Sequence, residues 1–324
     1  MRKITLGGPD GPRASVLCLG ALPFGSSVDR DTSFAILDRF VEAGGNFIDS
    51  ANNYVFWTEN GKGDESENLL GDWLRTRGNR SEVVLASKVG ALPDPAKPGA
   101  FPDNAEGLSA EVISTQLDNS LRRLGTDHLD VYYAHMEDRS VPLAETVGAF
   151  GKAVAQGKVR VPGCSNHPTW RIDRARELAK QDGLAPYGVL QFRHSYLRPR
   201  PDIRLPQAGH VQASDELLDY VRTEDNLVLT AYTTLLFGAY TRPDRPLHEH
   251  YDHPGTQRKI AVLQAVAAEL GATVNQVVLA WLLHGNPLVV PVLGVSSVAQ
   301  LEESLAAAEL ELSVDQLGRL AAAC

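Results

Sequence analysis

The chain has 324 residues and is acidic, with a formal net charge of −9 and a pI of about 5.5, so it lacks the basic character that nucleic-acid binding needs. No apolar run reaches the roughly 18 residues of a membrane-spanning helix, and the N-terminal segment has no apolar signal-peptide core. The cysteines Cys18, Cys164 and Cys324 show no paired spacing, which predicts free thiols in a soluble, cytoplasmic protein with no nucleic-acid or membrane partner.

Short apolar runs alternate with longer amphipathic stretches along the chain. A short hairpin, Lys3–Leu6 with Arg13–Leu17, is expected first and should close the bottom of the fold. Strand-like runs, each bounded by Gly, Pro or polar residues, then occur at Val16–Gly20, Asn46–Asp49, Val83–Ser87, Leu129–Ala134, Val159–Gly163, Gly188–Phe192, Leu227–Ala231 and Leu288–Leu293. Because apolar residues fill consecutive positions, these runs suit a parallel sheet buried on both faces.

Helical patterns separate the strands. They cover Ser33–Ala43, Glu65–Thr76, Ser109–Leu124, Pro142–Gln156, Thr169–Gln181, Asp215–Thr223, Gln257–Leu270, Asn275–His284, Ser297–Ala308 and Val314–Ala323. Since Gln257–Leu270 and Asn275–His284 adjoin, one of the two is expected to lie outside a regular ring of helices.

This alternation predicts an α/β fold, a single (β/α)₈ TIM barrel over residues 1–324 with an N-terminal β-hairpin and extra C-terminal helices. A doubly wound sheet is the rival, but it usually shows GxGxxG after its first strand, and Gly20 and Gly25 in LGALPFGSS have the wrong spacing. The Pro/Gly-rich segments Ala91–Gly107 and Arg198–Val211 are long enough to be functional loops.

Ionisable side chains follow three consecutive predicted strands. Asp49 ends the second, Lys88 follows the third and His135 follows the fourth, while Tyr54 lies in the loop after the second. The C-terminal strand ends of a barrel face one active-site mouth, so these four groups are expected to converge. Each alone is more often a cap or a surface charge, but their joint occurrence favours a site. Because Lys and Asp are rarely buried unpaired, Asp49 and Lys88 should pair.

Such a set suits the reduction of a carbonyl group. A free tyrosine, with a pKa near ~10, is a poor acid, and a neighbouring ammonium group should lower that pKa. Tyr54 would then donate a proton to the carbonyl oxygen as a hydride reaches the carbon. In this hypothesis Lys88 tunes the phenol, Asp49 holds Lys88, and His135 hydrogen-bonds the carbonyl oxygen.

The segments FIDSANNY (Phe47–Tyr54), SKVG (Ser87–Gly90) and LDVYYAHMED (Leu129–Asp138) resemble the aldo-keto reductases, and the similarity extends over nearly the whole chain. The resemblance implies that Tyr54 is the proton donor and that Asp49, Lys88 and His135 complete a catalytic tetrad. In its motifs the chain is nearest to the potassium-channel β-subunit-like bacterial branch of the family.

The resemblance also implies a nicotinamide cofactor. Ser165, Asn166 and Gln191 would hold its carboxamide, which needs a donor and an acceptor in one plane, and Tyr232 would stack on the nicotinamide ring. The remaining implied contacts are Thr233, Leu235 and Gly238 at the pyrophosphate, where Arg242 or Arg245 are further candidates, and Gly294, Ser296, Gln300 and Glu303 at the adenosine phosphate.

The adenosine-phosphate residues depart from those of many relatives. Many place Lys where Gly294 stands and Arg where Gln300 stands, and both cations hold a 2′-phosphate. The channel-subunit-like branch carries Ser and Gln there instead, so NADP(H) is the preferred cofactor and NAD(H) stays possible.

Apolar side chains near Tyr54 are expected to line a pocket for a small carbonyl or sugar substrate. The candidates are Phe24, Phe56, Trp57 and Tyr196, with Arg193 and His194 as polar options. Two other functions stay open: a nucleotide-binding regulatory or redox-sensing protein with weak reductase activity, and a lyase with Lys88 as a Schiff base, which pairing with Asp49 disfavours. The sequence does not indicate an oligomeric state.

Overall fold

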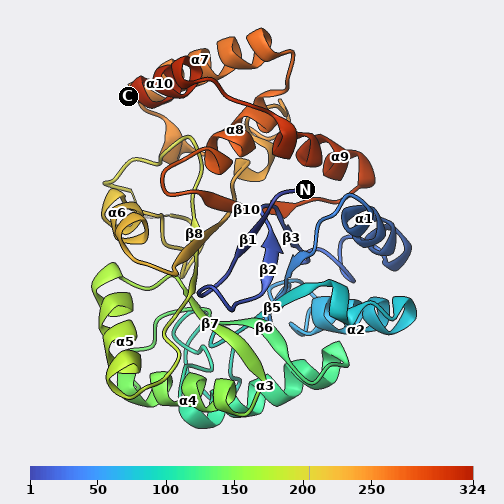
Figure 1. Cartoon of the computed structure of the whole chain (residues 1–324), viewed down its shortest axis with the longest axis vertical. Helices are drawn as coiled ribbons and strands as arrows, with labels where there is room; N and C mark the ends of the chain where they lie inside the picture. The colour runs from blue at the N-terminus through green and yellow to red at the C-terminus, as the bar shows by residue number, and fades with distance from the viewer. Residues whose placement is uncertain (204, 324) are drawn as a thin grey trace.

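Eight parallel strands close into a barrel in the computed structural model, which describes residues 1–203 and 205–323 (Figure 1). The order around the barrel is β10-β3-β4-β5-β6-β7-β8-β9. The bounds are Cys18–Gly20 for β3, Phe47–Asp49 for β4, Val84–Val89 for β5, Leu129–Ala134 for β6, Val159–Ser165 for β7, Val189–Arg193 for β8, Val228–Tyr232 for β9 and Val289–Gly294 for β10. The predicted (β/α)₈ barrel is confirmed.

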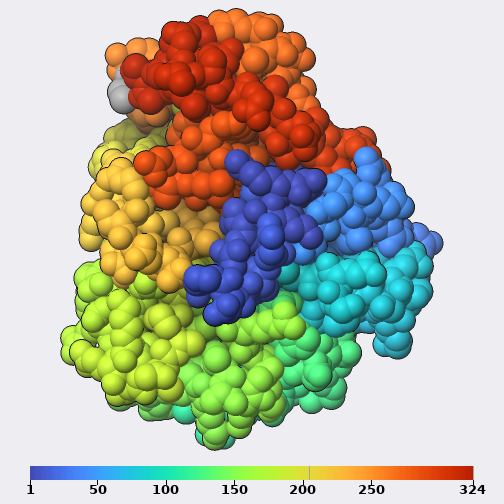
Figure 2. All heavy atoms as spheres, viewed as in Figure 1, coloured from blue at the N-terminus to red at the C-terminus, as the bar shows by residue number. Residues whose placement is uncertain are grey.

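The predicted hairpin is present and covers the N-terminal end of the barrel. Strands β1 (Lys3–Thr5) and β2 (Arg13–Ser15) pair antiparallel and lie across the barrel in Figures 1 and 2. Leu6 is fully buried in the apolar cluster that fills this end. Gly7 has a φ of 70°, and a Cβ at this position would lie 2.6 Å from Val161 Cγ1, so glycine allows the hairpin to approach the barrel closely.

Ten α-helices occur in the described residues. Their bounds are Arg30–Glu42 for α1, Glu65–Arg77 for α2, Ala110–Leu124 for α3, Leu143–Ala155 for α4, Thr169–Gln181 for α5, Asp215–Thr223 for α6, Pro254–Leu270 for α7, Val274–Leu283 for α8, Val298–Ala306 for α9 and Val314–Ala322 for α10. The side chain of Ser109 caps α3 by accepting from Val112 N, and α3 ends at Gly125 with a φ of 65°.

The insertion expected near the C-terminus is α7. Helix α8 packs on β10 and α9, whereas α7 contacts α8 and α10 and lies with α10 away from the barrel at the top of Figure 1. A second apolar cluster forms between these outer helices, with Leu263, Val277 and Leu320 among its buried members. No single described helix is long and apolar enough to cross a membrane. Helices α7 and α8 have that length and hydropathy only as a pair, and a bend of 96° lies between them.

Strands β5, β7, β8, β9 and β10 extend further toward the C-terminal end of the barrel than the sequence patterns predict. Strand β7 reaches Ser165 and β8 reaches Arg193, because pairing continues through Ser165↔Gln191 and Arg193↔Tyr232. These polar residues therefore belong to the rigid barrel rather than to its loops. Cys18 and Cys164 are buried free thiols, as predicted, and Cys324 lies outside the described residues.

Candidate active site

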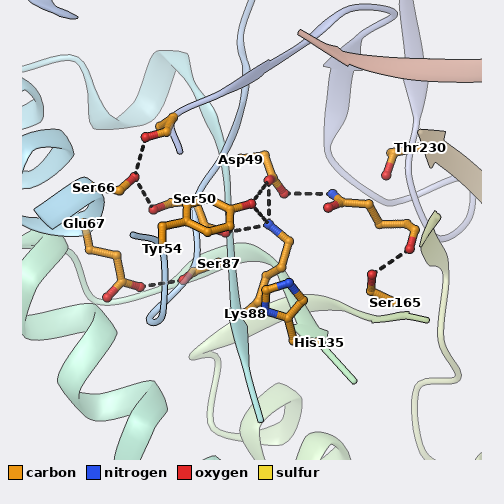
Figure 3. A network of polar contacts seen from close by, with 12 residues as sticks. Asp49, Ser50, Tyr54, Ser66, Glu67, Ser87, Lys88, His135, Ser165 and Thr230 are labelled. Carbon is orange, nitrogen blue, oxygen red and sulfur yellow. Dashed lines mark hydrogen bonds and ion pairs between the residues drawn. The ribbon is translucent and has the colours of Figure 1, made fainter. Parts of the chain in front are cut away.

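Tyr54, Lys88 and Asp49 meet at the C-terminal ends of β4 and β5 (Figure 3). The Lys88 ammonium group lies 2.5 Å from Asp49 Oδ2, 2.5 Å from the Tyr54 hydroxyl and 2.8 Å from the carbonyl oxygen of Ser50. The Tyr54 hydroxyl donates to Asp49 Oδ2 at 2.8 Å. All three side chains are buried, so the charges are screened little by water.

The pKa of Tyr54 changes in the opposite direction to the prediction that Lys88 lowers it. Burial, followed by the nearby Asp49 carboxylate, raises the pKa of Tyr54 well above its usual value of 10.0. Burial also lowers the pKa of Lys88, while Asp49 opposes that change. Tyr54 is therefore a protonated phenol at pH 7. It can donate a proton, and the adjacent ammonium group can stabilise the phenolate once the proton has left.

His135 follows β6 and lies beside the phenol. The rings of His135 and Tyr54 are edge-on, with centroids 6.3 Å apart, and Nδ1 of His135 is buried without a hydrogen-bond partner in the described residues. Burial, Lys88 and His210 hold the pKa of His135 well below its usual value of 6.5. The imidazole is therefore neutral at pH 7, with one N–H that can donate to an uncharged oxygen.

Gln191 contacts the cluster of Tyr54, Lys88 and Asp49 directly, which the sequence did not predict. Its Nε2 donates to Asp49 Oδ1 at 2.9 Å, while Lys88 and Tyr54 contact the other oxygen of the same carboxylate. Both oxygens of Asp49 thus have donors, and the amide from β8 fixes the carboxylate across the barrel. No sequence signal reveals this contact, because the two residues are separated by 142 positions.

Replacing Gln191 by leucine should lower kcat about tenfold and destabilise the fold by about 1–3 kcal/mol, because one carboxylate oxygen loses its buried donor. Steady-state kinetics and urea unfolding measure the two effects. A variant with unchanged kcat and weaker cofactor binding alone would show that Gln191 acts only on the cofactor.

Ser165 and Asn166 lie at the end of β7, and their polar atoms are already engaged. Asn166 Nδ2 donates to Ser165 Oγ at 2.9 Å and to the carbonyl oxygen of His135 at 3.1 Å. Asn166 Oδ1 accepts from the Tyr232 hydroxyl at 2.7 Å and from Val211 N at 3.0 Å. The residues predicted to hold a nicotinamide ring therefore form one connected polar cluster next to His135.

The segment after β9 holds the residues predicted at the pyrophosphate: Thr233, Leu235 and Gly238. Three non-glycine residues of this segment are left-handed, Thr233 with a φ of 56°, Leu236 with 50° and Phe237 with 60°. Such conformations cost of order 1–3 kcal/mol each and are typically found where a loop is shaped for a ligand.

The residues predicted at the adenosine phosphate gather where β10 leads into α9. Ser296 donates to Gln300 Oε1 through both its backbone N and its Oγ, and Glu303 Oε1 accepts from Thr273 and Asn275. A Cβ at Gly294 would meet nothing within 4 Å, which leaves open space beside them. The residues predicted at the adenosine phosphate therefore lie together at the N-terminal end of α9, a position that favours negative charge.

Two predicted substrate residues, Phe24 and Tyr196, have side chains that are only 0% and 1% exposed, and their place in a substrate pocket stays a prediction. Phe24 belongs to the main core between strands and helices. Tyr196 packs against Trp281, and its hydroxyl donates to the carbonyl oxygen of Leu320 in α10. His194, a polar option, is likewise buried, with its ring 5.7 Å from that of Trp281.

Phe56 and Trp57 keep exposed surface and stack edge-on, with ring centroids 5.2 Å apart. Phe101, from the long loop after β5, joins them at 5.1 Å from Phe56. Sequence reasoning missed this third ring, although it treated residues 91–107 as a functional loop. The three rings form an aromatic cluster on the loops that follow β4 and β5.

His210 is a second residue that sequence reasoning missed. It comes from the long loop after β8, and its ring lies edge-on to Tyr232 with centroids 4.9 Å apart. It is one of the groups that lower the pKa of His135, after burial and Lys88. Burial and Arg193 lower the pKa of His210 to about 4, so this second imidazole is also neutral at pH 7.

Residues 16–324 match the model of the aldo/keto reductase family. A norsolorinic acid reductase of Emericella nidulans is 33% identical over 319 residues, which cover 95% of this chain and 77% of the relative. An aryl-alcohol dehydrogenase [NADP(+)] of Phanerodontia chrysosporium is 29% identical, covering 95% and 82% of the two chains.

A thermostable aldo-keto reductase, solved with the inhibitor epalrestat, superposes with a TM-score of 0.76 and 25% identity over 100% of both chains. Neither of the two fungal relatives is named as a potassium-channel β-subunit, so placement in that branch stays a prediction. With the barrel and the matching residues in place, the chain belongs to the aldo/keto reductase family and is an oxidoreductase that acts on carbonyl groups.

Proposed function

We propose that the protein is an NADP(H)-dependent reductase that reversibly converts an aldehyde or ketone to an alcohol, with Tyr54 as the proton donor. The observation that carries this proposal is the buried contact among Tyr54, Lys88 and Asp49, in which the Lys88 ammonium group lies 2.5 Å from the phenol oxygen. A protonated phenol beside a buried cation is suited to releasing one proton and stabilising the anion that remains.

When bound, the reduced nicotinamide supplies the hydride that reaches the carbonyl carbon. His135, as a neutral imidazole, donates its N–H to the carbonyl oxygen and orients it. Tyr54 transfers its hydroxyl proton to that oxygen, and the phenolate formed is held by the Lys88 ammonium group, whose charge Asp49 balances. The phenolate regains a proton from solvent, so that one hydride and one proton are added to each carbonyl group.

The side chains at the ends of β7 to β10 would hold the cofactor. Ser165, Asn166 and Gln191 would hold its carboxamide by exchanging hydrogen bonds that their amide and hydroxyl groups now make within the protein, with Tyr232 as the stacking ring. The segment after β9 would follow the pyrophosphate through Thr233, Leu235 and Gly238, and the adenosine phosphate would lie at Gly294, Ser296, Gln300 and Glu303.

NADP(H) is favoured over NAD(H) by two observations. A relative matched over 95% of this chain is named for NADP(+), and the predicted adenosine-phosphate residues Ser296 and Gln300 lie beside the start of α9, whose N-terminus suits a phosphate. Fluorescence titration compares the two reduced cofactors directly, and tighter binding of NADH would reverse this preference.

Aryl aldehydes or ketones fit the rim of this site better than sugars do. The aromatic cluster of Phe56, Trp57 and Phe101 offers flat apolar surface, which suits a planar ring. The relatives named for aryl alcohols and for norsolorinic acid support the same class.

We expect the purified protein to oxidise NADPH in the presence of an aryl aldehyde such as benzaldehyde, with a kcat of roughly 1 s⁻¹ or more. The absorbance of the reduced cofactor follows the reaction, and aliphatic aldehydes and aldoses provide the comparison. Binding of NADPH without turnover of any carbonyl compound would contradict the proposal and favour a regulatory nucleotide-binding role.

A further inference from the structure

Arg193, the last residue of β8, is buried and has no negatively charged partner among the described residues. Its side chain is among the buried charged groups, at 4% exposure. It donates to two neutral atoms, Gln207 Oε1 at 2.7 Å and the Tyr251 hydroxyl at 3.3 Å. Its Nε is buried with no hydrogen-bond partner among the described residues. A guanidinium group thus retains an unused donor inside the protein.

Other arginines with largely buried side chains are neutralised. Each has a carboxylate within 3.2 Å: Arg80 with Asp130, Arg123 with Glu67, Arg171 with Glu137 and Arg176 with Glu224. No ion pair of Arg193 is found in the described residues. Because burying an unpaired charge is strongly unfavourable, a guanidinium in this position calls for an anion from outside the chain.

A cavity of about 250 Å³ adjoins this guanidinium. It lies between residues 205–207, which precede His210 in the loop after β8, and residues 236–251 after β9. Arg245, His248 and His250 also line it, and the one carboxylate among its described lining residues, Asp244, is paired with Arg242 at 2.5 Å. The walls therefore offer cationic or hydrogen-bonding groups and little free negative charge, which suits an anion.

We propose that Arg193 and this cavity form a binding site for an oxyanion, a phosphate or a carboxylate group. A guanidinium group presents its N–H donors in a planar fork that matches such oxygens, and the remaining Nε–H has no competing partner in the described residues. The ring of Phe237 lies 5.9 Å from the guanidinium carbon and limits its movement on one side.

Two molecules of the proposed reaction carry this chemistry, so the identity of the anion rests on the proposed function. The first is the cofactor, because the cavity is walled by Leu236, Phe237 and Ala239, which follow Tyr232 in the segment predicted at the pyrophosphate. The second is a carbonyl substrate with an acidic group. The existence of the site depends on neither.

Titration calorimetry of the full chain with inorganic pyrophosphate tests the site without any turnover. Arg193→Met should weaken pyrophosphate binding roughly 10- to 100-fold, since a charge-assisted pair is lost. The matched control is Arg222→Met, which removes an exposed arginine paired with Asp219. Equal binding by wild type and Arg193→Met, or no binding by wild type, would overturn the site even if the chain proves to be an active reductase.

Thermal unfolding separates anion binding from a purely structural role for Arg193. Pyrophosphate should raise the Tm of wild type but not that of Arg193→Met, and without the anion the variant should be at least as stable as wild type, because a buried unpaired charge has been removed. A variant with a lower Tm that still responds to pyrophosphate like wild type would make Arg193 a structural residue bonded to Gln207 and Tyr251.

The source of the anion is identified by two further measurements on Arg193→Met. A tenfold rise in the Kd of NADPH, with an unchanged ratio of kcat/KM for 4-carboxybenzaldehyde over benzaldehyde, assigns the site to the cofactor. A tenfold fall in that ratio with an unchanged NADPH Kd assigns it to the substrate. If both quantities equal those of wild type, neither molecule supplies the anion, and the link between the site and the proposed reaction is overturned, while the pyrophosphate titration alone decides whether the site exists.

Discussion

Tyr54→Phe should lower kcat by about 10³-fold or more, while cofactor affinity stays within about twofold of wild type, because the variant lacks only the proton that the reaction needs. The ring is retained, so the packing against His135 and the Lys88–Asp49 pair persist. Single-turnover absorbance with bound NADPH measures the chemical step, and fluorescence titration measures the affinity.

Tyr132→Phe is the matched control for this substitution. Tyr132 is fully buried, and its hydroxyl has no partner among the described residues, but its ring packs on Phe150 in the outer core. Removal of that hydroxyl should leave kcat unchanged. If Tyr54→Phe retained turnover within about tenfold of wild type, proton donation would have to be assigned to another group, and His135 would be the first to consider.

The barrel could be predicted closely because strands buried on both faces appear in the sequence as continuous apolar runs. Their ends, however, depend on hydrogen bonding between strands. The run at Gly188–Phe192 gives no sign that pairing continues to Arg193, whose partner Tyr232 is far away in the sequence. Because the pairing continues by this one residue, Arg193 belongs to the barrel and not to the loop that follows it.

The convergence of Asp49, Tyr54, Lys88 and His135 could be predicted because a barrel brings its strand ends together regardless of the rest of the chain. The direction of the pKa change could not, because desolvation depends on how completely Tyr54 is enclosed, and the sequence does not report this. The proximity of Lys88 was correctly expected, yet burial raises the pKa of the phenol despite it.

The substrate residues were the least predictable part of the site. Tyr196 follows the end of β8 by three residues, which suggests the mouth of the barrel, but the chain has by then turned outward to the cluster between α7, α8 and α10. His210 and Phe101 come from long loops without periodicity. Their positions depend on contacts such as that of Val211 N with Asn166, which no local pattern encodes.

Lys88→Met should abolish turnover and lower the free energy of unfolding by about 3–5 kcal/mol, because it leaves the buried Asp49 carboxylate without a cation. Adding Asp49→Asn should restore most of that stability, since the remaining group is neutral and can still bond to Tyr54 and Gln191. Urea unfolding measures both variants, and NADPH oxidation measures their activity.

The double variant separates the two roles of the lysine. If charge balance were its only function, restoring stability would restore activity as well, whereas a cation that stabilises the Tyr54 phenolate cannot be replaced by neutralising Asp49. We therefore expect a stable double variant with turnover still at least about 10²-fold below wild type. A double variant as unstable as Lys88→Met alone would show that the stability of the fold does not depend on the ion pair. The hydrogen bond from Lys88 to the carbonyl oxygen of Ser50 would then be the more important contact.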